Sequence, residues 1–353
     1  MKNTKIQWCH STVNPAMGCD GCELWPPAAQ IATGIETALQ FGCGVPSEIV
    51  KAAIRAAIDR RPTSEIYADR DSVAERLQIT LGLSSGDRQA VIDVIRSNAK
   101  CYAGLLGTMR AGHKGYADQF EMPKLYPGRM ATAAGWRTPT EQEVADKLWL
   151  TGLPRLIFIS DMGDVLSKGI PFEYLKTEII GQVCSAEGSR HIWLWLSKRP
   201  ARMAQFGQWL NQHGVEWPSN LMAMTTITAQ SKASRLDDLR KVPSRLKGLS
   251  IEPLLERVHL DLRGVDWIIV GGGSDVLAEP FHVEWALELR KQSRDKGAAL
   301  FLKQLGKRPF FANKPIDLQD PHGGDWQEWP SAWRVREFPR AFHRGSLNRS
   351  RNQ

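Results

Sequence analysis

Short apolar runs alternate with longer segments of helical spacing over the second half of the chain. The runs are rich in β-branched and aromatic residues, as is typical of buried strands. They lie at 155–160, 191–197, 220–226, 245–251, 266–272 and 298–304. Crossover helices, which parallel strands require, are predicted where apolar residues recur three or four positions apart, at 171–186, 199–212 and 283–297.

The repeated strand–helix units, with one more strand expected at 5–8, predict an α/β fold. We expect a TIM-type β/α barrel, complete or partial. An open doubly wound sheet is the alternative, because periodicity does not separate the two architectures. In either fold, the carboxyl ends of the strands are the expected place for chemistry.

Residues 23–100 have a different pattern, with apolar residues at helical spacing and no convincing strand. We expect a helical insertion in which Asp71 and either Ser84 or Ser85 cap helices. The barrel is then built from 1–22 and 101–309. Residues 310–353 are rich in Pro, Trp, Gly and Arg, which predicts an irregular C-terminal extension that wraps the barrel and ends in a disordered basic tail after about His343.

The composition indicates a soluble globular protein. Of the 353 residues, 42% are hydrophobic and 24% are charged, which excludes disordered and fibrous classes. No apolar run approaches the length of a membrane span, and the first residues lack the apolar stretch of a signal peptide. We therefore expect a cytoplasmic protein without a membrane partner. The net charge of +8 permits attraction to nucleic acid, with Trp326, Trp329 and Trp333 as candidate contacts.

The six cysteines are expected to be thiols, metal ligands or catalytic groups, because disulfides are rare in a reducing compartment. Cys19 and Cys22 form a C-x-x-C pair in a glycine-containing loop, which suits zinc, an iron–sulfur cluster, a redox dithiol or a structural pair. We expect Cys184 on the apolar face of a helix and Cys43 buried in the insertion. Cys9 is a further candidate ligand, because it is close in sequence to this loop.

A series of motifs gives the chain a family resemblance. In order they are WCHSTVNPAMGCDGC, KCYAG, FEMPKLYPGRM, RLIFISDMGD, LWLSKRP, LSIEPLL, WIIVGGGSD, FLKQLG and HGGDWQEWP. Together they resemble the phage-associated radical S-adenosylmethionine-like family catalogued as domain of unknown function 5131. The resemblance spans nearly the whole chain.

The resemblance implies a [4Fe–4S] cluster held by the thiolates of Cys19, Cys22 and Cys101. One iron would remain free to bind S-adenosylmethionine, which an electron supplied by a partner would cleave to a 5′-deoxyadenosyl radical. Tyr102 would pack near the adenine. In the family pattern the third cysteine follows the second closely, whereas 78 residues separate Cys22 from Cys101 here. The insertion would then be a loop whose ends meet at the cluster.

Polar residues and glycines follow the predicted strands. By the resemblance, Asp161 and Asp164 would contact the methionine part of the cofactor, although Asp164 also suits a helix N-cap. Lys198 and Arg199 suit a carboxylate or phosphate, or remain solvated. The other candidates around the predicted pocket are Glu252, Gly271, Gly272 and Lys303. For Glu252 a structural salt bridge is the alternative.

Two function classes follow. The first is a radical S-adenosylmethionine enzyme that acts on a nucleic-acid component in phage-related metabolism. The second is a non-catalytic barrel module that binds zinc through the same cysteines and recognises nucleic acid or protein. A redox dithiol formed by Cys19 and Cys22 is a third possibility.

Overall fold

The computed structural model describes residues 2–39, 45–275 and 278–343. The chain separates into two compact units. We call Met1–Pro15 with Tyr126–Gln353 the sheet unit, and Ala16–Leu125 the helical unit. The helical unit contains the predicted insertion 23–100 and extends beyond it on both sides, so that Cys19, Cys22 and Cys101 all belong to it.

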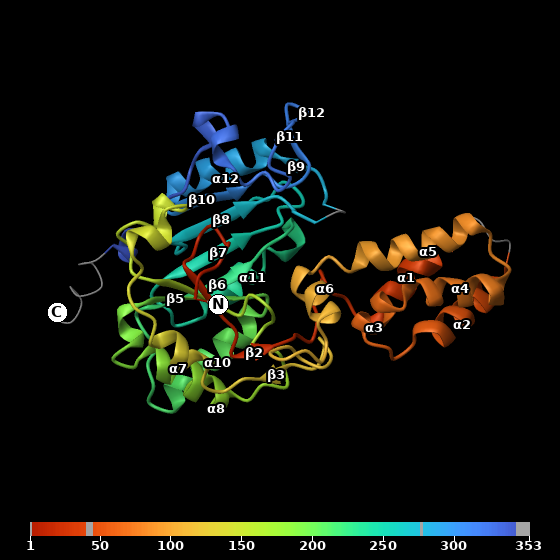
Figure 1. Ribbon diagram of the computed structural model, residues 1–353, viewed down its shortest axis with the longest axis horizontal. Coiled ribbons are helices and arrows are strands. Elements are labelled where there is room, and N and C mark those ends of the chain that lie inside the picture. The colour runs from red at the N-terminus through yellow and green to blue at the C-terminus, as the bar shows by residue number, and fades with distance from the viewer. Residues whose placement is uncertain (1, 40–44, 276–277, 344–353) are drawn as a thin grey trace. The chain divides into compact units, whose positions relative to one another are not determined.

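A seven-stranded, wholly parallel sheet forms the centre of the sheet unit (Figure 1). Its strands are β1 (Ser11–Val13), β4 (Leu156–Ile159), β5 (Ile192–Ser197), β6 (Leu221–Thr226), β7 (Lys247–Ile251), β8 (Trp267–Gly271) and β10 (Ala299–Gln304). All six strands predicted in the second half are confirmed. The strand predicted at 5–8 is wrong, because the β-branched Thr12 and Val13 pair with β4 instead.

The order of the strands decides between the two predicted architectures. It follows the chain from β1 to β10 without reversal, which excludes the doubly wound alternative and makes a curled half-barrel. A complete barrel does not form among the described strands. The outer edge of β10 is instead covered by the C-terminal extension, because Leu302 N donates to Val335 O at 2.8 Å and Glu337 N to Leu300 O at 2.9 Å.

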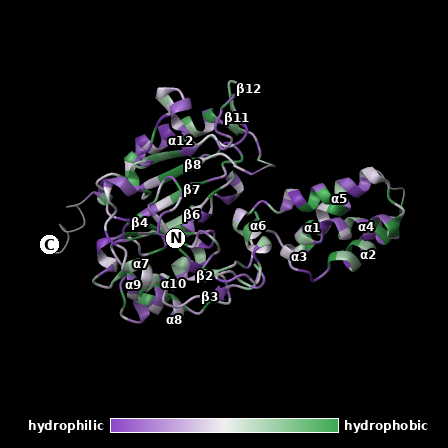
Figure 2. Cartoon of the chain, in the orientation of Figure 1, coloured by the Kyte–Doolittle hydropathy of each residue, from purple (hydrophilic) through white to green (hydrophobic). Residues whose placement is uncertain are grey.

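The two faces of the sheet have different partners. Trp195 packs against Phe206 of α10 on the helix-covered face. Its neighbour Leu194 points to the other, concave face, where it joins a buried apolar cluster with Phe158, Met224 and Phe301. Apolar residues predominate along the central strands in Figure 2. Alternation thus gives both faces a hydrophobic core, as parallel strands require.

Helices and short elements complete the sheet unit. The helices predicted at 199–212 and 283–297 are confirmed, and that at 171–186 consists of short consecutive α and π segments. The elements are α7 (Arg129–Ala134), α8 (Phe172–Tyr174), the π segment Leu175–Ile180, α9 (Gly181–Val183), α10 (Pro200–Gln212), α11 (Arg235–Arg240), α12 (Val283–Lys296), β9 (Phe281–His282), β11 (Pro309–Phe311) and β12 (Lys314–Pro315). Cys184, expected in the core, is exposed because α9 ends just before it.

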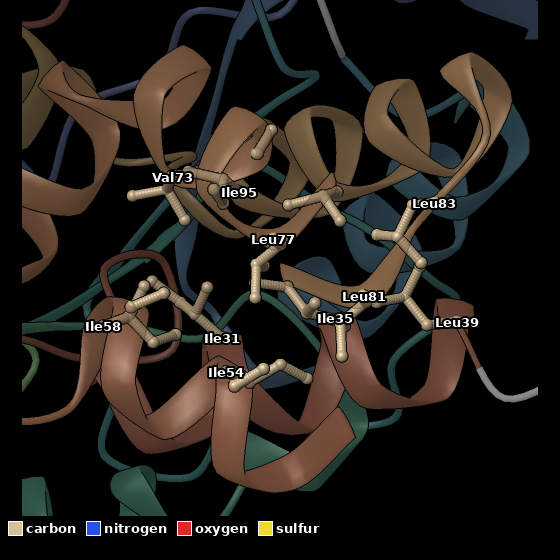
Figure 3. Close-up of a cluster of buried hydrophobic side chains, with 14 of the residues drawn as sticks. Ile31, Ile35, Leu39, Ile54, Ile58, Val73, Leu77, Leu81, Leu83 and Ile95 are labelled. Atoms are coloured by element: carbon tan, nitrogen blue, oxygen red, sulfur yellow. The ribbon is translucent and has the colours of Figure 1, made fainter. Parts of the chain in front are cut away.

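The helical unit is built on its own hydrophobic core. Figure 3 shows Ile31, Ile35, Leu77 and Leu81 among the apolar side chains that meet between the helices. Its elements are α1 (Ala28–Leu39), α2 (Ser47–Ile58), α3 (Thr63–Ala68), α4 (Arg70–Leu81), α5 (Ser85–Asn98), α6 (Tyr102–Met109), β2 (Ala16–Met17) and β3 (Lys124–Leu125). The predicted helical character of the insertion is confirmed. Cys43 lies outside the described residues.

The predicted helix caps have mixed outcomes. Ser84 caps α5, since its hydroxyl accepts from Asp87 N at 3.1 Å and the Asp87 carboxylate accepts from Ser84 N in return. Asp71 is not a cap, because α4 begins one residue earlier and Asp69 occupies the N-cap position. The charge of Asp71 in the first turn still suits the helix dipole.

The C-terminal extension lies along the sheet and uses its aromatic residues internally. Arg336 stacks on the ring of Trp149 at 3.8 Å and of Trp326 at 4.6 Å. Trp329 and Trp333 are buried, so the expectation that these two contact a partner is wrong. The tail predicted to be disordered after about His343 lies outside the described residues. Within the described residues, no helix has the length and apolar character that crossing a bilayer requires.

Two buried histidines predict a loss of stability in acid. Burial lowers the pKa of His10 to about 3, aided by Arg155 and Lys147, and burial lowers the pKa of His191 to about 4. Their stabilising effect is complete above the unfolded pKa of about 6.5 and is lost as the pH falls from there towards the folded values. At about pH 5 we expect each to reduce the unfolding free energy by about 2 kcal/mol relative to neutral pH.

Urea unfolding at neutral pH and at about pH 5 measures this loss. His191→Gln keeps a donor for the Ala134 carbonyl, which the His191 ring nitrogen contacts at 2.9 Å, but does not titrate. The loss of unfolding free energy between neutral pH and about pH 5 should therefore be smaller in this variant by the contribution of His191, about 2 kcal/mol. An unchanged loss would contradict the assignment.

Candidate functional site

The loop that carries Cys19 and Cys22 is shaped by two glycines. Gly18 and Gly21 have φ angles of +97° and +92°, which only glycine adopts without strain. A Cβ on Gly18 would lie 2.5 Å from the Phe120 carbonyl oxygen, and that same oxygen accepts a hydrogen bond from Cys19 N at 2.7 Å. The loop is therefore held tightly against the segment that returns from α6.

A pair of hydrogen bonds closes the base of the helical bundle. The Leu24 carbonyl accepts from Lys100 N at 3.0 Å and from Cys101 N at 2.9 Å. Cys22 and Trp25 also exchange backbone hydrogen bonds, at 3.1 and 2.9 Å, so the chain turns sharply after the C-x-x-C pair. The backbone of Cys101 is thus brought beside the cysteine loop despite the intervening helices.

Helix α6 begins directly after Cys101 and packs against the segment that follows the C-x-x-C pair. Gly104 contacts the buried ring of Trp25, and Gly107 contacts that of Phe120. Glu121 accepts from Trp25 Nε1 at 2.7 Å and from the hydroxyl of Ser64 on α3 at 2.6 Å. The base of the bundle is therefore a defined structural element. Tyr102, in the first turn of α6, is largely exposed.

The three thiols differ in exposure. Cys19 is buried, Cys22 and Cys101 are partly exposed, and none of the described cysteines forms a disulfide. No group of three or more His, Cys, Asp and Glu side chains in the described ranges is arranged to hold a metal ion. The donor set suits a soft metal or an iron–sulfur cluster. The backbone contacts bring the cysteine segments together, and a three-thiolate site would require the side chains to reorient.

The close contact between α6 and Trp25 gives a prediction for Gly104→Ala. The new Cβ would lie 2.5 to 2.8 Å from three atoms of the Trp25 ring. Overpacking should outweigh the gain in helix propensity of about 1 kcal/mol, and we expect a net destabilisation of about 1–3 kcal/mol in urea unfolding.

Gly181→Ala is the matched control for this substitution. Gly181 is also helical, and the nearest atom to an added Cβ is the Lys176 carbonyl oxygen at 3.6 Å. This variant should be neutral or slightly stabilised. Equal changes in unfolding free energy for the two substitutions would show that the Trp25 ring shifts to accommodate the new methyl group without loss of stability.

In the sheet unit, the carboxyl end of β1 holds both chain connections to the helical unit. Tyr126 N donates to Pro15 O at 2.8 Å, and the Tyr174 hydroxyl donates to the same oxygen at 2.6 Å. The helical unit begins after Pro15 and ends before Tyr126. The chain therefore leaves and re-enters the sheet unit at the sheet edge where ligands of β/α folds bind.

Asp161 follows β4, and its carboxyl group is oriented by Asn14, the residue directly after β1. Asn14 Nδ2 donates to Asp161 Oδ1 at 2.6 Å, and Asn14 Oδ1 accepts from Met162 N at 2.9 Å. Burial raises the pKa of Asp161, and hydrogen bonds from Asn14 and Thr12 partly oppose that rise. The result is an aligned carboxyl group in a sheltered position.

Ser160, immediately before Asp161, has two unusual properties. Its φ is +72°, a conformation that is strained for a residue with a side chain. Its hydroxyl is buried and has no hydrogen-bond partner among the described residues. Such outliers cluster at functional sites, so Ser160 is a candidate that the sequence did not reveal.

Asp164 is a buried link between the loop after β4 and the end of β5. Its carboxylate accepts from Ser197 Oγ at 2.8 Å, from Lys198 N at 3.2 Å and from Leu166 N at 2.9 Å. It also forms an ion pair with Arg199 at 2.8 Å. The predicted helix-cap role of Asp164 is wrong, because no helix begins there; it positions the Lys198–Arg199 segment.

Glu252, after β7, pairs with a residue of β10. The Lys303 ammonium donates to Glu252 Oε1, and Gln304 Nε2 approaches the same oxygen at 3.4 Å. Gly271, at the end of β8, lies between them, since an added Cβ would be 3.5 Å from the Glu252 carboxyl carbon. Gly272 serves packing, because its Cβ would lie 2.5 Å from Leu305 O.

Strand alternation brings several of these residues to one face. Ser160, Lys198, Glu252 and Gly271 each lie two residues beyond an inward-facing strand position, so the concave face changes from apolar to polar at its carboxyl end. The register of β10 shifts around Lys303, which joins this group through its hydrogen bond to Glu252. Asp161 and Lys303 also both act on the pKa of the buried Cys9 thiol, which burial raises. Cys9 itself lies in the sheet core, in the other unit from the cysteine loop.

Sequence reasoning missed Asn14 because it placed the first strand at 5–8. With β1 at its actual position, the rule that polar residues follow strands would have selected it. The positive φ of Ser160 has no such sequence signal.

A family match spans most of these elements. The family described as a protein of unknown function (DUF5131) matches residues 93–330. The chain belongs to this family. The DUF5131 match includes Cys101 and all strands from β4 to β10, while Cys19, Cys22 and β1 precede it. Searches of curated proteins and of solved structures found no match.

Proposed function

We propose that this DUF5131 protein is a radical S-adenosylmethionine enzyme. Cys19, Cys22 and Cys101 would supply three thiolates to a [4Fe–4S] cluster. When bound, the cluster would supply the electron that cleaves S-adenosylmethionine reductively, with an external protein as electron donor. The chain's own residues would hold the thiolates, orient the substrate groups and limit the access of water.

The observation that supports this proposal is the closure of the bundle at Leu24. Its carbonyl accepts hydrogen bonds from two successive backbone amides, those of Lys100 and Cys101. A purely structural C-x-x-C pair would not need a third cysteine at that point. The long separation in sequence is therefore no obstacle to a shared ligand set, since the closing cost grows slowly with loop length.

The strand ends of the sheet unit carry polar groups of their own that suit a ligand. The Asp161 carboxylate, aligned by Asn14, suits the ammonium group of the methionine part. The Asp164 network holds the Lys198 and Arg199 segment, which suits a carboxylate. The Glu252–Lys303 pair offers an acceptor and a donor for hydroxyl groups, and Gly271 lies beside Glu252 and Gln304. Tyr102 offers an exposed ring for the adenine.

A nucleic-acid component is the substrate class we propose for this enzyme. It is supported by the net charge of +8, which favours association with phosphates. An enzyme that acts on a base must reach it in a single strand or flip it out of a duplex. The salt dependence of binding to a single-stranded oligonucleotide tests this class separately from the chemistry.

Anaerobic reconstitution of the full chain with iron and sulfide tests the proposed activity. A cluster of about four irons and four sulfides per chain, followed by reductive release of 5′-deoxyadenosine from S-adenosylmethionine, is expected. One bound zinc with no iron would replace the proposal by a zinc-binding module. Reversible disulfide formation between Cys19 and Cys22 without a cluster would indicate a redox dithiol.

A further inference from the structure

A cavity lies at the amino ends of the strands, opposite the candidate site. It has a volume of about 460 Å³ and is lined by His10, Arg137, Glu143, Lys147 and Arg155, among others. His10 precedes β1, and Arg155 precedes β4 by one residue. All of these residues belong to the sheet unit, and the volume is within the usual range for small-molecule sites.

Two buried donors at this cavity are incompletely hydrogen-bonded. His10 Nδ1 accepts from Leu156 N at 2.9 Å, so in the neutral ring the proton is on Nε2. Neither His10 Nε2 nor Arg155 Nη2 makes a well-formed hydrogen bond in the described part of the chain, although the Leu150 backbone approaches the His10 ring and Glu143 lies 3.7 Å from Arg155 Nη2. The two residues are 6% and 1% exposed. Leaving a buried donor unpaired is unfavourable, and this argues for an acceptor that the protein itself does not provide.

The charges around the cavity favour an anionic acceptor. Lys147 is buried and donates to the carbonyl oxygens of Thr4, Ile6 and Cys9. Arg155 donates to the carbonyl of Arg137 at 2.7 Å and to Ser11 Oγ at 2.8 Å. The hydrogen bonds of both cations thus go to neutral groups, while Asp146 acts electrostatically on Lys147 and Glu143 on Arg155.

The carboxylates of the cavity compensate these charges incompletely. Glu143 lies 3.7 Å from Arg155 Nη2, but it already pairs with Arg137 at 3.1 Å and accepts from Thr140 N at 2.9 Å. Asp146 also lines the cavity. The positive potential is evident at His10, whose pKa is lowered by burial and then by Arg155 and Lys147. The cations that line the cavity, Lys5, Arg137, Lys147 and Arg155, therefore outnumber its carboxylates, Glu143 and Asp146.

We propose that this cavity binds a small molecule through an oxyanion group, either a carboxylate or a phosphate. Arg155 Nη2 and His10 Nε2 donate to the oxyanion after a small movement of the Glu143 side chain, and the exposed Arg137 guanidinium pairs with it from the rim. A guanidinium presents parallel donors that match both kinds of oxyanion. The site lies at the amino end of β4, whereas the candidate site of the proposed enzyme lies at its carboxyl end.

Isothermal titration of the full chain with inorganic phosphate, and separately with acetate, tests the proposal. Arg137→Gln removes a side chain that is 55% exposed, so the fold should be preserved. His10→Asn keeps an acceptor for Leu156 N but removes the Nε2 donor. Arg60→Gln, at a side chain that is 94% exposed in the helical unit, is the control.

We expect saturable binding that both cavity variants weaken by at least about tenfold and that the control leaves unchanged. Tighter binding of phosphate or of acetate identifies the oxyanion that the cavity prefers. Absence of saturable binding to the native protein, or equal affinities in native protein and Arg137→Gln, would overturn the proposal. The second comparison remains decisive even if His10→Asn does not fold.

Discussion

Replacing Cys101 with alanine is expected to reduce 5′-deoxyadenosine formation by the reconstituted protein at least about a hundredfold, since even outer-shell changes at metal sites cost ten- to a hundredfold. The reason is that two thiolates from Cys19 and Cys22 leave a [4Fe–4S] cluster one protein ligand short. The iron content per chain should fall together with the activity. Both quantities are measured on the same anaerobic preparation.

This result can be separated from a folding defect. Cys101 is the N-cap of α6 but makes no side-chain capping hydrogen bond, and its backbone contact with Leu24 survives the substitution. The urea midpoint should therefore change little. Cys184→Ala removes an exposed cysteine of the sheet unit and should keep both iron and activity. Full activity in Cys101→Ala would refute the long-range ligand assignment.

The fold could be predicted largely because its signals are local. The six central-sheet strands β4 to β8 and β10 are each a short apolar run, and α10 and α12 have clear helical spacing. The first strand was misplaced because Trp8 gives a strong apolar signal at 5–8, although it packs in the core as part of a turn. Closure of the barrel depends on which segment covers β10, and that is a tertiary contact with no local pattern.

The candidate site could be predicted only in part. Residues that directly follow strands were found, because parallel strands bring their carboxyl ends to one edge. The sequence did not determine their roles. Asp164, for example, was compatible with a helix N-cap and with a ligand contact, and only its four partners identify it as a link between loops. Gly272 looked like an open backbone, yet it packs against Leu305. Partner identity depends on side-chain geometry that spacing does not encode.

Substitution of Asp164 by asparagine is expected to be the most destabilising change at the strand ends. In the native protein, Asp164 Oδ2 accepts hydrogen bonds from Lys198 N and from the Arg199 guanidinium. Asparagine keeps one acceptor oxygen, but its amide group places a donor against one of these donors. Arg199 is only 17% exposed and would lose its counter-ion. Breaking a buried ion pair in this way typically costs about 3–5 kcal/mol, which urea unfolding would detect as a large fall in midpoint.

The same substitution at an exposed pair separates burial from charge. Asp237 pairs with Arg240 at 2.7 Å, nearly the distance between Asp164 and Arg199, but its side chain is 68% exposed instead of 8%. Asp237→Asn should therefore change stability by no more than about 1 kcal/mol, because water solvates both partners once the pair is broken. Comparable losses in the two variants would mean that the Asp164 network is solvated in the native protein, and its role in holding the Lys198–Arg199 segment would have to be abandoned.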